Sequence, residues 1–206
     1  MPLLSVNGMG HMRPAACHLA IAATVLFAAT PARAKGGAIK GKVDVTPARY
    51  LEDTVVYLKE VKGRYSPRTH ALDQKGMRFL PHIVTVTVGD TVHFFNHDNV
   101  AHEVYSSDGE GYNLGFFKQD EERTHRFTRT GVYSQQCTIH PEMLAYIFVG
   151  QNPYAAAVDM KGGYEIRDVP PGTYQLAVWN AKLQAPERTV VVSAGEVRHE
   201  NLSLQR

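Results

Sequence analysis

Cysteine is scarce in this chain of 206 residues, which has only Cys17 and Cys137. Two cysteines this far apart exclude a disulfide-stapled scaffold, a C-x-x-C-H haem attachment and the usual thiolate-rich zinc sites. Charge of one sign is also lacking, because 22 Lys and Arg face 20 Asp and Glu, and no basic run occurs. The electrostatics therefore indicate no nucleic-acid partner.

Helical periodicity is nearly absent beyond Lys35. Short runs of alternating or β-branched residues recur instead, separated by turn signals such as Gly89-Asp90 and Pro170-Pro171-Gly172. This spacing predicts an all-β fold built from sandwiches. Residues 106–122 are expected to form a long loop or a short helix. The expected strands are residues 38–44, 54–58, 83–88, 91–96, 124–128, 132–137, 145–149, 164–167, 173–179, 188–192 and 197–202.

The first 34 residues have the order of a secretory signal peptide. His11 and Arg13 precede an apolar run over residues 15–29, and Ala32-Arg33-Ala34 forms a small-x-small cleavage site. The run is shorter than the ~20 apolar residues that span a bilayer, although a retained anchor is the alternative. We expect cleavage after Ala34, a periplasmic or secreted chain, and no stable membrane span afterwards.

Cleavage would remove Cys17 and two arginines, leaving no net charge and Cys137 as the single cysteine. Cys137 opens a C-x2-H-x2-M segment that continues to His140 and Met143, between two expected strands. His102 follows another strand. A thiolate, two imidazoles and a thioether are the donors of a blue-copper site. A binuclear copper centre would need a second cysteine in this segment, which is missing.

The sequence resembles the cupredoxins, in particular a plastocyanin- and amicyanin-like, methylamine-utilisation-type subgroup. Besides the C-T-I-H-P-E-M segment, the matching motifs are Asp73-Gln74-Lys75, Phe79-Leu80-Pro81-His82, Val88-Gly89-Asp90-Thr91-Val92, Phe95-Asn96-His97-Asp98 and Val104-Tyr105-Ser106. The resemblance implies a Greek-key sandwich with one type 1 copper. It also implies His102, Cys137, His140 and Met143 as ligands, and outer-sphere electron transfer through the edge of His140.

The neighbours of His102 depart from this resemblance. Small cupredoxins often have Pro before and Asn after the first histidine, whereas this chain has Ala101 and Glu103. The side-chain amide of Asn96 is expected to lie near the segment of residues 137–143 and to hydrogen-bond around the metal ligands without being a ligand itself. Among the remaining histidines, His93 is expected to be a half-exposed sheet residue and His97 a solvent-exposed turn residue. A second metal site built from His82, His93, His97 or His125 is the alternative.

A second module is indicated on both sides of this region. Residues 159–166 and 169–176 resemble the turns of the carboxypeptidase regulatory-like, transthyretin-type sandwich, and residues 41–43 and 54–58 resemble its opening strands. We therefore expect a discontinuous sandwich of residues 38–65 and 153–206, interrupted by a cupredoxin domain of residues 66–152. An independent C-terminal appendage is the alternative. Trp179, Tyr164 and Tyr174 are expected in a core.

These features predict a periplasmic type 1 copper protein that carries single electrons between redox partner proteins, which the sequence does not identify. No acid–base constellation or second catalytic metal site is evident, so the chain is not expected to be an enzyme. The alternative is a copper-sequestering or copper-sensing protein whose second sandwich docks a partner.

Overall fold

The computed structural model describes residue 2 and residues 35–206, so the signal-peptide prediction lies outside the described residues. Within them the chain is all-β, with seventeen strands and one 3-10 turn at Ala48–Leu51. Ala34–Arg206 form one compact unit. The described residues include no helix with the length and apolar character that crossing a membrane requires.

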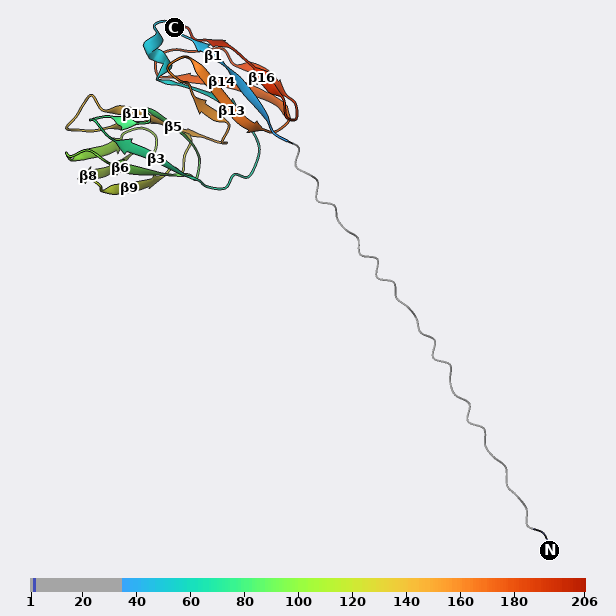
Figure 1. Ribbon diagram of the computed structural model, residues 1–206, viewed down its shortest axis with the longest axis horizontal. Helices are drawn as coiled ribbons and strands as arrows, with labels where there is room; N and C mark the ends of the chain where they lie inside the picture. The colour runs from blue at the N-terminus through green and yellow to red at the C-terminus, as the bar shows by residue number, and fades with distance from the viewer. Residues whose placement is uncertain (1, 3–34) are drawn as a thin grey trace. The chain divides into compact units, whose positions relative to one another are not determined.

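Strands from the two ends of the described chain pair with one another (Figure 1). One sheet has the order β13-β1-β16, with β17 also on β1, and a second has the order β12-β2-β14-β15. Their bounds are Gly37–Asp44 (β1), Thr54–Lys59 (β2), Ala155–Ala157 (β12), Gly163–Val169 (β13), Gly172–Asn180 (β14), Arg188–Val192 (β15), Val197–His199 (β16) and Leu202–Ser203 (β17). Neither β1 nor β2 pairs with any described strand between residues 66 and 152.

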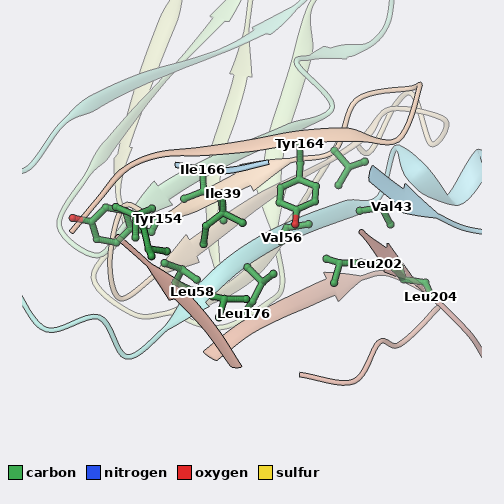
Figure 2. Packing of buried hydrophobic residues seen from close by; sticks show 14 of the residues in the cluster. Ile39, Val43, Val56, Leu58, Tyr154, Tyr164, Ile166, Leu176, Leu202 and Leu204 are labelled. Carbon is green, nitrogen blue, oxygen red and sulfur yellow. The ribbon is translucent and has the colours of Figure 1, made fainter. Parts of the chain in front are cut away.

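The two sheets enclose the first hydrophobic core (Figure 2). Ile39 from β1, Val56 and Leu58 from β2, and Leu176 from β14 are all almost fully buried there. Burying one such side chain contributes about 1.5–3 kcal/mol, so strands distant in sequence depend on each other for stability. Gly41 is required in β1, because a Cβ atom at this position would lie 1.7 Å from the carbonyl oxygen of Glu200.

The middle of the chain forms two more sheets. One has the order β5-β11-β10-β7-β8 and the other β4-β3-β6-β9, and all pairs are antiparallel except β5 with β11 and β3 with β6. Their bounds are Thr69–Gln74 (β3), Phe79–Leu80 (β4), Ile83–Thr87 (β5), Thr91–Asn96 (β6), His102–Ser106 (β7), Tyr112–Phe117 (β8), Glu122–Arg126 (β9), Gly131–Gln136 (β10) and Leu144–Gly150 (β11). A second core fills the space between them, around Phe94, Phe127 and Ile147.

The expectation of a loop or helix over residues 106–122 is wrong, because β8 lies within this segment. Strand β8 is an edge strand that pairs with β7, and its register shifts between Glu103 and Tyr105. Gly115 has a positive φ, and the irregular register hides the two-residue alternation that marks a strand. Strands β3, β4, β7 and β12 were not among the expected strands either, and all of these are six residues or shorter.

Strand β11 borders two hydrophobic clusters with its two faces. Ile147 and Val149 enter the second core, whereas Phe148 joins Val55 and Ile83 in a third cluster, against which Trp179 packs. The alternation of side chains along a strand accounts for this division. Tyr164 and Tyr174 belong to or pack against the first core, but Trp179 lies at the third cluster. The domain boundaries at residues 66 and 152 stay a prediction.

Candidate metal site

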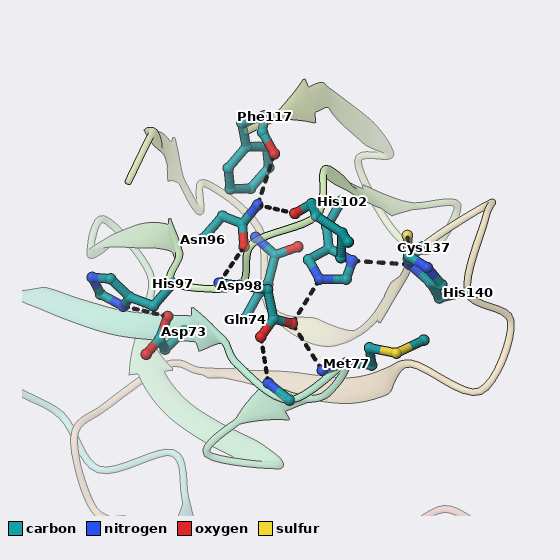
Figure 3. Close-up of polar contacts among 12 residues, drawn as sticks. Asp73, Gln74, Met77, Asn96, His97, Asp98, His102, Phe117, Cys137 and His140 are labelled. Atoms are coloured by element: carbon teal, nitrogen blue, oxygen red, sulfur yellow. Dashed lines mark hydrogen bonds and ion pairs between the residues drawn. The ribbon is translucent and has the colours of Figure 1, made fainter. Parts of the chain in front are cut away.

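Three donor atoms converge at one end of the second core. His102, Cys137 and His140 each offer one ligand atom, and these atoms all lie within 4.8 Å of one another. Nδ1 of His102 lies 2.9 Å from Nδ1 of His140, which in turn lies 3.7 Å from Sγ of Cys137 (Figure 3). Two imidazoles and a thiol at these separations can share one metal ion. Within the described part of the chain, this is the single group of three such donors that the structure brings together.

The pairing of β10 with β11 determines the loop that carries two of these donors. Gln136 is opposite Leu144, so residues 137–143 form the connection between the strands. The N–H of Met143 donates to the carbonyl of His140 at 2.9 Å, which closes the loop into a turn. His102 begins β7, whose Tyr105 is opposite Gln136 of β10. Adjacent strands therefore bring His102 to the loop.

Burial differs among the four predicted ligands. His102, Cys137 and Met143 are at most 2% exposed, whereas His140 is half-buried and keeps part of its ring at the surface. Met143 lies in the same hydrophobic cluster as Cys137. The structure thus places Met143 in the core that adjoins the three donors, and its role as an axial ligand stays a prediction.

Asp98 orients the ring of His102. The Nε2–H of His102 donates to Oδ2 of Asp98 at 2.8 Å, which leaves Nδ1 to face Cys137 and His140. The same carboxylate accepts the N–H groups of Gly76 and Met77 at 2.6 and 2.8 Å (Figure 3). Burial raises the pKa of Asp98, but the bonds from Met77, His102 and Gly76 outweigh burial and leave this pKa below its ordinary value. Carboxylates that hold ligating histidines in this way strengthen metal sites.

Glu103 connects the two segments that carry the donors. Its backbone N–H donates to Sγ of Cys137 at 3.4 Å. Its buried carboxylate accepts a hydrogen bond from Asn113 at 2.7 Å and another from the hydroxyl of Thr138. Glu103, which stands where small cupredoxins often have Asn, therefore joins β7 to the ligand loop of residues 137–143 by hydrogen bonds.

Asn96 holds the segment that precedes His102. Its side-chain oxygen accepts the N–H of Asp98 at 2.9 Å, and its amide donates to the carbonyls of Val100 and Phe117, each at 2.9 Å. None of these partners belongs to residues 137–143. Asn96 thus shapes the segment that leads to His102 and acts on the site through its hydrogen bond to Asp98.

Sequence reasoning missed Asp98 and Glu103 as parts of the site. Asp98 stands four residues before His102, and Glu103 follows it directly. The sequence offered one signal for them: each is an acidic residue close in the chain to His102, which is itself a predicted metal ligand. Their partners, however, come from the β3–β4 turn, from β8 and from the ligand loop, which only the fold brings together.

The other histidines of this region each face a carboxylate. The nitrogen–oxygen distances are 2.8 Å for His70–Asp90, 2.7 Å for His82–Asp53, 3.8 Å for His93–Glu122, 2.7 Å for His97–Asp73 and 3.3 Å for His125–Glu110. None of them is part of the three-donor group. Each of these imidazoles thus has a carboxylate partner, and a structural role for them stays a prediction.

Large apolar side chains are exposed on the segments that adjoin the donors. They are Met77 in the β3–β4 turn, Val100 before His102, Phe116 on β8, Ile139 beside His140 and Leu144 at the start of β11, and each is between 38% and 53% exposed. These five are half of the ten large apolar side chains that are exposed in the described part of the chain.

Comparison with known proteins adds partial matches. Residues 150–199 match a family described as polysaccharide lyase family 4, domain II. This description differs from the transthyretin-type family that residues 159–176 resemble, so that resemblance stays a prediction. No curated protein matches the chain.

Several solved structures are similar to part of the chain. A Cu(I) form of an amicyanin mutant is 26% identical, with a TM-score of 0.37, over 39% of this chain and 81% of that one. A reduced amicyanin mutant is 28% identical, with the same TM-score, over 38% and 79%. A purple cupredoxin from Nitrosopumilus maritimus is 22% identical, with a TM-score of 0.36, over 39% and 99%.

Proposed function

We propose that this chain is an exported type 1 copper protein that carries single electrons between redox partner proteins and is not an enzyme. The observation that carries the proposal is the convergence of His102, Cys137 and His140 within 4.8 Å. In this proposal these three residues hold one copper ion, with Met143 as the weak axial ligand.

The chemistry of the donors fits copper. A thiolate suits Cu(I) and imidazoles also accept Cu(II), so one site can serve both oxidation states. A copper ion held there would supply one-electron chemistry. The chain's own contribution is rigidity: Asp98 fixes the ring of His102, and the N–H of Glu103 donates to the sulfur of Cys137. Ligands held in this way move little when the charge of the site changes.

His140 gives the site its route to a partner. Its ring is half-buried, whereas His102 and Cys137 are covered by the protein. Ile139, its neighbour in the chain, and Leu144 at the start of β11 are exposed and apolar, so a partner that covers them displaces little strongly bound water. A periplasmic location agrees with the signal-like pattern of residues 1–34.

We also propose the discontinuous domain arrangement. In it, residues 38–65 and 153–206 form one sandwich that residues 66–152 interrupt. The pairing of β1 with β13 and of β2 with β14 supports this division, as do the two separate cores.

The test is to add Cu(II) to the purified chain and record visible absorption and electron paramagnetic resonance spectra. We expect an intense thiolate-to-copper band with narrow hyperfine splitting, and its loss in the Cys137→Ser variant. His140→Ala should also weaken the band. His97→Ala is its matched control and should keep the band, because His97 pairs with Asp73 outside the donor group. Bound copper without the intense band would contradict the proposal. Copper that binds without reversible redox cycling would favour sequestration or sensing instead.

A further inference from the structure

A cavity of about 330 Å³ lies beside the third hydrophobic cluster and has none of the metal donors in its lining. Its walls include Tyr57 from β2, Val132 from β10, Phe148 from β11, Ala155 from β12 and Trp179 from β14. Small-molecule sites commonly have about this volume and walls of this kind. We propose that this cavity binds a small, neutral, planar aromatic molecule that carries oxygen acceptors.

Aromatic rings from β2, β11 and β14 give the cavity its preference for a planar apolar molecule. The rings of Tyr57 and Phe148 lie 4.8 Å apart at 50°, and Trp179 meets Tyr146 at 5.1 Å. Tyr57 and Trp179 are half-buried, so each ring keeps surface that a bound molecule can cover. Aromatic pairs in such tilted or stacked arrangements contribute attraction beyond the burial of area.

Two of the residues that line the cavity, Tyr57 and Trp179, carry hydrogen-bond donors. Within residues 35–206 the structure shows no protein hydrogen-bond partner for the hydroxyl of Tyr57 or for the indole N–H of Trp179, and neither atom is buried, so both are open to the solvent side of the cavity. An indole N–H can only donate. A tyrosine hydroxyl already keeps its proton at neutral pH, and burial raises the pKa of Tyr57 further. A carbonyl or ether oxygen on the bound molecule would satisfy these donors.

The charges around the cavity favour a neutral molecule. Lys59 is already paired with Glu187 at 2.7 Å, and Glu60 is exposed to water. Asn152 uses its amide on the carbonyl of Leu58 and its oxygen on the N–H of Tyr154. No buried charge among the lining residues is left to attract an ion.

The position of the cavity connects it to the hairpin that carries the metal donors. Val132 and Phe148 project from one face of β10 and β11, whereas Tyr133 and Ile147 project from the other face into the core that holds Cys137. A molecule in the cavity would therefore lie against the outer side of this hairpin. The inference does not depend on copper, and its test reads binding alone.

Coumarin is a suitable probe, because it is planar, neutral and carries two oxygen acceptors. Trp179 is the only tryptophan of the chain, so a ¹H–¹⁵N spectrum contains one indole resonance. We expect coumarin to shift this resonance saturably. Tyr57→Phe keeps the ring and removes the hydroxyl, so it should weaken binding about threefold to tenfold. Tyr174→Phe is the matched control, because that hydroxyl donates to Pro170 outside the cavity.

A second variant tests the place of binding. Val132→Phe puts a larger side chain into the cavity and so fills part of it. Phenylalanine also favours strands, so the fold should be kept while the coumarin-induced shift is abolished. An indole resonance that coumarin does not move would overturn the proposal. So would a saturable shift that Tyr57→Phe leaves unchanged. If Val132→Phe fails to fold, the comparison of Tyr57→Phe with Tyr174→Phe decides the question alone.

Discussion

Asp98 contacts His102 on the nitrogen that faces away from Cys137 and His140, and this contact leads to a prediction about metal affinity. Asp98→Ala should leave the ring of His102 free to rotate and weaken copper binding about 10-fold or more. Competition with a copper chelator measures the change. Asp73→Ala, which removes the partner of His97, is the control and should leave the affinity unchanged. Equal losses in the two variants would argue against a positioning role for Asp98.

At the same scale, the sequence predicted the residues whose spacing is local. Cys137 and His140 lie within one connection between strands, and the structure brings both into the three-donor group, whereas the role of Met143 in the same connection stays a prediction. Asp98 and Glu103 were not predicted, because their roles depend on contacts with Gly76 and Thr138, which are distant in the chain. A carboxylate in a sequence does not indicate which backbone N–H groups will surround it.

Among the elements, Glu110 ties the start of β8 to the end of β9. Its carboxylate accepts hydrogen bonds from the hydroxyl and N–H of Thr128 at 2.6 and 3.2 Å and faces His125 at 3.3 Å. Burial raises the pKa of Glu110, but the bonds from Thr128 and His125 outweigh it and lower this pKa below its ordinary value. A carboxyl group whose pKa is lowered by folding stabilises the fold above its unfolded pKa.

The stabilisation by Glu110 should therefore be present at neutral pH and disappear as the pH falls through the folded pKa. Glu110→Gln should lower the free energy of unfolding by about 1 kcal/mol at neutral pH and have little effect near pH ~3. Urea unfolding at the two pH values measures the difference. Glu142→Gln is the control, because this side chain is exposed and has no ion pair within the described residues. A pH-independent loss for Glu110→Gln would mean that packing, not charge, is responsible.

Strand prediction succeeded where one face of the strand is consistently buried. In β6, for example, Val92, Phe94 and Asn96 alternate with half-buried residues, and the predicted bounds agree with the structure. It failed for β8, where a register shift interrupts the alternation. Edge strands receive much of their conformation from one neighbour, so a single sequence carries a weak signal for them.

For the molecule as a whole, the ends of the middle segment lie close together. Arg68 lines the same small cavity as Asn152 and Pro153, so the chain enters and leaves the middle region at one place. An inserted domain needs this proximity, because its host sandwich must close around both ends. Turn motifs on both sides of the middle region predict a discontinuous sandwich, which stays a prediction, but which strands pair between residues 38–65 and 153–206 could not be read from the sequence.

The fragment of residues 153–206 should therefore fail to fold alone. It lacks β1 and β2, which pair with β13 and β14, and with them the buried side chains Ile39, Val56 and Leu58. At about 1.5–3 kcal/mol each, these three residues contribute about 5–9 kcal/mol, comparable with the whole stability of a small domain. Joining residues 35–65 to 153–206 by a short glycine–serine linker should restore cooperative urea unfolding, followed by the fluorescence of Trp179. A cooperative transition in residues 153–206 alone would instead show an independent C-terminal domain.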